Sequence, residues 1–163
     1  MVTEIKRIEK EIEISAYIAK LKHALKNGAK ISFQEDRKVD EERNIKNTNK
    51  YTVASLFPNE NPVDALRREL QTLTVSNYIC SVSDTRFPKR SEMRVFGKKY
   101  NVNEDVYIKI RVELFDPSGA GNHTTFVMSF HFAEKAFTSG DFPYGNKNYI
   151  WRGQPYEGNK IRI

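Results

Sequence analysis

The sequence predicts a single domain that combines α-helices with an antiparallel pair of β-strands. Three observations support this prediction. A chain of 163 residues has the size of one ordinary domain, and it can bury a core without metal or disulfide support. Apolar residues recur at helical spacing in its first half. In its second half, two segments alternate apolar and polar residues, which is the pattern of half-buried strands.

Residues 3–27 have the composition of a helix that ends at the stop signal Asn27–Gly28. Two apolar rows follow each other there: Ile5, Ile8 and Ile12, then Ile14, Ile18, Leu21 and Leu25. Because the second row is shifted by two residues, the pattern fits either one long helix or two abutting helices.

The middle of the chain predicts a loop and a second helix. Residues 31–33 suggest a short extended segment, residues 35–50 are almost wholly polar and predict a loop, and residues 51–57 fit either a strand or a short helix. The next helix is clearer, because Asn61 is a good N-cap and Pro62 suits the first helical position. Its apolar face consists of Val63, Leu66, Leu70 and Leu73.

Residues 105–114 and 125–132 predict two antiparallel strands joined by a turn-rich connection. The apolar residues expected on the shared inner face are Ile108, Ile110, Phe126, Met128 and Phe130. Both sets must face the core, so paired residue numbers should sum to an even value close to 240. This register places His131 opposite Lys109, with Tyr107 and Arg111 as alternatives one pleat away, all on the face turned from the core. Residues 93–100 predict a further strand, in which Gly97 suggests a bulge or the close approach of another backbone.

Charge and composition favour a cytoplasmic protein with an anionic partner. The net charge is +6, and residues 86–111 contain eight basic residues against three acidic ones. The basic residues that we expect to contact RNA phosphates are Lys89, Arg90, Arg94, Lys98 and Arg111. The alternative is that these residues only solvate exposed edges. The single cysteine, Cys80, cannot form an internal disulfide, no apolar run is long enough to span a membrane, and the N-terminus is too charged for a signal peptide.

The polar face of the strand pair suits metal-free RNA cleavage. No metal-binding or phosphate-loop motif is visible in the sequence, so we expect no metal and no cofactor. RNA supplies its own nucleophile, the 2′-hydroxyl, and cleavage then needs proton transfer and cations that stabilise the phosphate. Histidine titrates near neutrality, at a pKa of about 6.5. The candidate catalytic residues are therefore His131, Tyr107 and Lys109, unless this face merely happens to carry one histidine.

Several short motifs, taken in order, resemble the motility quorum-sensing regulator (MqsR) family of toxin–antitoxin ribonucleases, which belongs to the RelE-like group. The motifs are LTVSNY (73–78), RVFGK (94–98), VYIKI (106–110), SFHFAE (129–134) and FPY (142–144). The resemblance covers residues 17–144. It implies a small α+β domain of the RelE-like microbial ribonuclease fold, with N-terminal helices packed on one face of an antiparallel sheet. It also implies metal-independent endoribonuclease activity on mRNA.

Matched position by position, the resemblance gives Tyr107 the role of the family's functional tyrosine, and His131 that of the lysine or histidine of the last core strand. Relatives often carry a lysine where this chain has Cys80, so that basic contribution is missing or comes from one of four other residues: Lys89, Arg90, Arg94 or Lys98. The implied partners are mRNA and a cognate antitoxin protein, with the ribosome left open and no membrane. The expected organisation is a ribonuclease domain over residues 1–137 and a Gly/Asn/Tyr-rich extension over residues 138–163, which forms a hairpin or orders on a partner.

Two other functions remain open at this stage. One is a catalytically inactive relative that binds RNA through the same basic face. The other is a protein-interaction module whose aromatic C-terminal portion docks a partner. Salt-dependent RNA binding distinguishes the ribonuclease from the protein-interaction module. Substitution of His131 distinguishes the ribonuclease from the inactive RNA-binding relative.

Overall fold

The structure is a computed structural model that describes residues 3–36, 44–101, 104–114, 123–146 and 148–153, without the side chains of residues 114 and 123. The helices are α1 (Glu11–Lys26), α2 (Asn49–Leu56) and α3 (Pro62–Leu70), with short 3-10 turns at Ile45–Asn47, Val75–Asn77 and Ser139–Asp141. The strands are β1 (Glu4–Arg7), β2 (Lys30–Phe33), β3 (Tyr78–Asp84), β4 (Met93–Tyr100), β5 (Glu104–Leu114) and β6 (His123–Phe132).

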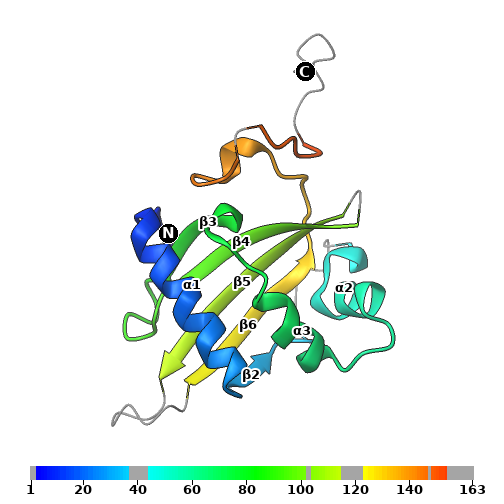
Figure 1. Cartoon of the computed structure of the whole chain (residues 1–163), viewed down its shortest axis with the longest axis horizontal. Coiled ribbons are helices and arrows are strands. Elements are labelled where there is room, and N and C mark those ends of the chain that lie inside the picture. Colours follow the sequence, from blue (N-terminus) through cyan, green and yellow to red (C-terminus); the bar gives the residue numbers. More distant parts are fainter. Residues whose placement is uncertain (1–2, 37–43, 102–103, 115–122, 147, 154–163) are drawn as a thin grey trace.

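The strands form one six-stranded sheet in the order β1-β3-β4-β5-β6-β2. This is an α+β architecture. The sheet is mixed, however, because β2 runs parallel to β6 while the other pairs are antiparallel. The prediction of an antiparallel sheet is therefore wrong at this edge. The cause is α1, which connects the two edge strands by crossing the sheet from β1 to β2 (Figure 1). After this crossing, the chain enters β2 in the same direction as β6.

The N-terminal segment is a strand followed by a helix, and not a helix from residue 3. β1 pairs with β3 from Glu4–Asp84 to Arg7–Ser81. As a result the first apolar row is not a helix face, and Ile5, Ile8 and Ile12 are all exposed. Pairing with a strand distant in sequence outweighed the local helical composition. The helix end at Asn27–Gly28 is confirmed, with Gly28 in the left-handed region at φ 84°.

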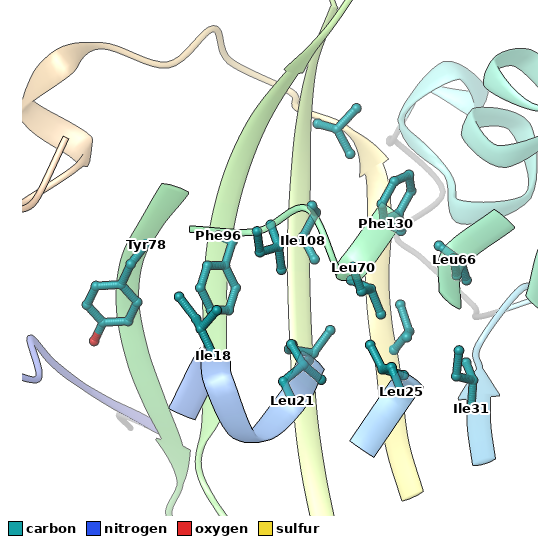
Figure 2. Close-up of a cluster of buried hydrophobic side chains, with 14 of the residues drawn as sticks. Ile18, Leu21, Leu25, Ile31, Leu66, Leu70, Tyr78, Phe96, Ile108 and Phe130 are labelled. Carbon is teal, nitrogen blue, oxygen red and sulfur yellow. The ribbon is translucent and has the colours of Figure 1, made fainter. Parts of the chain in front are cut away.

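The core lies between one face of the sheet and the helices α1 and α3. Figure 2 shows Ile18, Leu21 and Leu25 of α1 facing the sheet residues Phe96, Ile108 and Phe130. The predicted cap of α3 and the predicted inner positions of Leu66 and Leu70 are confirmed, whereas Leu73 is buried just beyond the end of the helix. Asn61 Oδ1 accepts hydrogen bonds from the backbone N–H groups of Val63 and Asp64, and Leu66 and Leu70 are fully buried.

The ambiguous segment after residue 50 is helical, and α2 lies beside β6 (Figure 1). Polar side chains of α2 replace a neighbouring strand there. Asn49 Nδ2 donates to Met128 O at 3.0 Å, Asn49 Oδ1 accepts from Phe130 N at 3.0 Å, and Thr52 Oγ1 accepts from Phe132 N at 2.8 Å. These bonds satisfy buried backbone groups that would otherwise lose water without gaining a partner.

The predicted β5–β6 pair is confirmed, but a β-bulge changes its register. Lys109 pairs with Ser129 and Ile110 pairs with Val127, which leaves Met128 as the extra residue. Pair numbers therefore sum to 238 on one side of the bulge and 237 on the other. The expected inner positions of Phe126 and Met128 are wrong, because both side chains are only half-buried and Val127 takes the place in the core.

The opposite face of the sheet is partly covered by residues 133–146 and 148–153, which follow β6. Phe137, Phe142 and Trp151 form a second apolar cluster that packs against Ile79 and Tyr107. Gly97 makes this possible, since a Cβ atom there would lie 2.6 Å from Phe137 Cε2 and 2.9 Å from Phe142 Cζ. The close approach predicted at Gly97 is thus made by side chains and not by backbone. No strand follows β6 among the described residues, and residues 154–163 of the expected extension lie outside them.

Within the described part of the chain, no helix is both long enough and apolar enough to cross a membrane.

Candidate functional site

Tyr107 and His131 are direct cross-strand partners on the face that the helices do not cover. Their rings are stacked, with centroids 5.3 Å apart and an interplanar angle of 21°. The histidine therefore stands opposite one of the two alternatives of the sequence prediction, one pleat from the preferred Lys109. On the far side of Tyr107, its β4 partner is Gly97, and Phe137 fills the space that Gly97 leaves.

His131 is only 6% exposed, although it points away from the helical core. Its Nδ1 lies 3.0 Å from Phe132 O. Because a carbonyl oxygen can only accept, Nδ1 carries the proton in this contact, and Nε2 is the nitrogen that gains or loses a proton when the ring titrates. The backbone therefore orients the ring and fixes its tautomer.

A cavity of about 620 Å³ opens beside this pair. Its floor is formed by side chains of β5 and β6, and its wall by the chain that follows β6. The lining residues are Tyr107, Lys109, Ser129, His131, Ala133, Glu134, Lys135, Ala136, Phe137, Thr138 and Asp141. The volume lies within the range of small-molecule and nucleotide sites, ~300–1,000 Å³. All three predicted catalytic residues line this cavity.

The wall of the cavity contains residues that the sequence prediction missed, including Lys135 and Asp141. They lie in a segment without periodicity, so no sequence pattern pointed to them. Asp105 shapes this wall, because its backbone oxygen accepts from Ala133 N at 2.8 Å and its Oδ2 accepts from Phe137 N at 3.0 Å. One residue thus holds both ends of the segment 133–137.

The formal charges of the cavity lining balance. Lys109 and Lys135 are positive, and Glu134 and Asp141 are negative. Lys109 is engaged further, since its Nζ lies 2.9 Å from Glu4 Oε2 of the edge strand β1. The cavity itself is therefore not a strongly positive surface.

Cys80, the single cysteine, is buried on the same face as Tyr107. Burial raises the pKa of its thiol, against the opposing effect of the positive charges of Lys6 and Lys109. Lys6 therefore brings a second positive charge close to this position, from a strand that the sequence prediction took for helix.

The five predicted RNA-binding residues do not form one surface. Arg111 lies on the cavity face beyond the bulge, where its guanidinium covers the ring of Phe126 at 4.7 Å and pairs with Glu113 at 3.3 Å. Lys89 and Arg90 belong to the β3–β4 connection, which lies at the same end of β5 as Arg111, since Ser91 Oγ donates to Val112 O at 3.2 Å.

Arg94 and Lys98 point to the helix-covered face, as does Phe96 between them. Arg94 makes a bidentate ion pair with the buried carboxylate of Glu9, at 2.9 and 3.0 Å. Burial alone would raise the pKa of Glu9, but the hydrogen bonds from Arg94 and Ser81 and nearby positive charges outweigh it, and the pKa is lowered. Lys98 contacts the Thr72 hydroxyl and lies 4.0 Å from Glu69, and burial lowers its pKa. Neither residue reaches the cavity.

In the described segments, no group of three or more His, Cys, Asp and Glu side chains is arranged to hold a metal ion. Comparison with known proteins finds no matching family model, no matching characterised protein and no matching solved structure.

Proposed function

We propose that this protein is a metal-independent endoribonuclease with a RelE-like fold, the toxin of a toxin–antitoxin pair, and that it cleaves mRNA in the cavity beside His131. The observation that carries the proposal is the stacked Tyr107–His131 pair at the floor of a cavity that two lysines line. A cognate antitoxin protein is the implied partner, and the ribosome is a further partner to be tested.

In the proposed reaction, the 2′-oxygen of one nucleotide forms a bond to the adjacent phosphorus and the bond from phosphorus to the 5′-oxygen breaks. The proton of the 2′-hydroxyl passes to a base, and protonated His131 donates the Nε2 proton to the leaving 5′-oxygen. The contact between Nδ1 and Phe132 O persists in both protonation states of the ring. Lys109 and Lys135 stabilise the charge on the phosphate, and Tyr107 orients it.

The test is cleavage of several RNAs by the purified protein in the presence of a chelator, with and without ribosomes. Wild-type products should end in a 2′,3′-cyclic phosphate. His131→Ala should lower the rate by ~10²–10⁴-fold, as expected for loss of a general acid or base. The matched control is His23→Ala, since His23 is exposed on α1. A folded His131→Ala protein that cleaves at the wild-type rate would falsify the assignment.

A catalytically inactive relative that binds RNA or protein is the second candidate, and two observations favour it. His131 is nearly inaccessible, and the charges of the cavity lining balance. This candidate predicts that the wild-type protein binds RNA or a protein partner but produces no cleavage in any of the reactions above.

A further inference from the structure

The connection between β3 and β4 presents an aromatic ring framed by arginines. Phe87 is 42% exposed, so part of its side chain is accessible to a partner. The guanidinium of Arg90 lies over its ring at 3.9 Å, and that of Arg86 lies near it at 5.7 Å. The backbone bonds Phe87 N to Asp84 O and Arg90 N to Phe87 O, both at 3.0 Å, hold the turn in shape.

The basic residues of this turn differ in whether they form an ion pair. Arg86 is bound by both carboxylate oxygens of Asp84, at 3.0 and 2.8 Å. Lys89 and Arg90 have no ion pair with any described residue, and both are exposed. The turn therefore offers two positive charges and a guanidinium plane to a partner, whereas the cavity offers no net charge.

Strand β1 connects the turn to the cavity. The first described residue, Thr3, accepts a hydrogen bond from Thr85 N at 2.8 Å, and the next, Glu4, pairs with Lys109 of the cavity floor. The negative charge of Glu4 also raises the pKa of Arg86, after the larger effect of Asp84. A ligand that extends from Lys109 in the cavity therefore has to pass only Glu4 and Thr3 to reach the turn.

We propose that residues 86–90 form a second RNA contact that selects single-stranded RNA. An unpaired base stacks on the guanidinium of Arg90 and the ring of Phe87, and Lys89 contacts a phosphate. Stacking of this kind requires a base face that a duplex keeps covered by its neighbours. The inference rests on the proposed function, because it assumes that RNA also enters the cavity.

The test measures binding of a fluorescent 2′-O-methyl oligouridine, which lacks the nucleophile and cannot be cut. Phe87→Ala should weaken binding by about 5- to 150-fold, the range expected for one stacked base. Lys89→Ala should instead reduce the slope of log affinity against log salt by about 0.7, as for one single-strand phosphate. The matched controls are Tyr51→Ala, an equally exposed aromatic residue at 42%, and Lys20→Ala on α1.

Two further probes decide the class of ligand. A 2′-O-methyl duplex should bind equally to wild type and Phe87→Ala, since it offers no free base face. Equal affinity of wild type and Phe87→Ala for the oligouridine would overturn the inference. So would Phe87-dependent binding to phosphatidylserine vesicles without Phe87-dependent binding to the oligouridine, because a membrane-surface anchor would then explain the turn.

Failure of this inference is distinguishable from failure of the proposed function. The oligouridine reports binding at the turn whether or not the cavity is catalytic. Cleavage by wild type together with Phe87-independent binding rejects the second contact alone. Phe87-dependent binding without any cleavage of natural RNA rejects the ribonuclease and leaves the contact supported.

Discussion

The rings of Tyr107 and His131 lie 5.3 Å apart across two neighbouring strands, and the tyrosine ring also contacts the cluster of Phe137, Phe142 and Trp151. The histidine is thus held between a backbone carbonyl and an aromatic ring that is itself packed on its far side. A side chain with so few alternatives loses little freedom on binding a substrate, which favours a defined proton-transfer geometry.

Tyr107→Phe should distinguish the role of the tyrosine hydroxyl from that of the aromatic ring. The variant keeps the stacking and the packing, so a change in its free energy of unfolding reports on the hydroxyl alone. If the hydroxyl orients the phosphate, RNA cleavage should fall by about 10- to 100-fold. Tyr107→Ala removes both parts, and its loss of stability in a denaturant titration provides the comparison. An unchanged cleavage rate in Tyr107→Phe would restrict the residue to a packing role.

Gly97→Ala should detach the C-terminal cluster from the sheet. The added methyl would meet Phe137 Cε2 at 2.6 Å and Phe142 Cζ at 2.9 Å, and overpacking of this kind costs about 1–3 kcal/mol. Trp151 is the only tryptophan, so its fluorescence should shift to longer wavelength as it gains water. Gly140→Ala is the control, because its Cβ would meet nothing closer than 3.6 Å. Equal fluorescence in the two variants would argue against this packing.

Glu9→Gln should destabilise the fold by about 2–4 kcal/mol, because it leaves the Arg94 guanidinium in a largely buried place without its counter-charge. Arg94 keeps a longer ion pair of 3.8 Å to Glu92, a hydrogen bond of 3.5 Å to Glu92 O and its place over the Tyr17 ring at 4.4 Å. Its side chain is also 17% exposed, so the loss should lie below that of a fully buried pair. Glu11→Gln, at an exposed position of α1, is the control. Chemical denaturation measures both variants, and similar midpoints would contradict the structural role of the pair.

Stability should fall in acid, because the fold lowers the pKa of several carboxylates, Asp84 and Glu9 among them. The hydrogen bonds from Arg86 lower the pKa of Asp84 to about 2, and the pKa of Glu9 is also lowered. In the range below the ordinary carboxylate pKa of about 4, the unfolded chain binds more protons than the folded one, so stability decreases as the pH falls. Denaturant midpoints between neutral pH and pH 2 measure this. Glu9→Gln should show a shallower decrease than wild type, and an equal slope would exclude Glu9 as a contributor.

The sequence predicted the elements whose patterns are local. The alternation in β5 and β6 gave both strands, and Asn61 and Pro62 gave the start of α3. It could not predict the bulge, because Phe126, Met128 and Phe130 alternate without a break. The alternation within β6 carries no information about Asn49, which is distant in sequence. The side chain of Asn49 binds the backbone of both Met128 and Phe130, beside the bulge.

The candidate site was predictable in its floor and not in its wall. The floor residues Tyr107, Lys109 and His131 lie on the same face of the β5–β6 pair. The alternation of apolar and polar residues along each strand is enough to predict which face a side chain is on. Lys135 and Asp141 reach the cavity because Asp105 and Gly97 hold the following chain in place, through contacts far apart in sequence. The prediction that Arg94 contacts a phosphate rested on the excess of basic residues, and charge alone does not tell which side of a strand carries a buried ion pair.

The order of the strands has a consequence for synthesis of the chain. Both edge strands, β1 and β2, lie within the first 33 residues, whereas the four strands between them end only at Phe132. At typical translation rates of about 5–20 residues per second, roughly 5–20 s pass between completion of β2 and completion of β6. During that time α1 has no complete sheet on which to bury Ile14, Leu21 and Leu25. The nascent N-terminal segment therefore keeps an incompletely covered apolar surface, which is the kind of surface on which chaperones act.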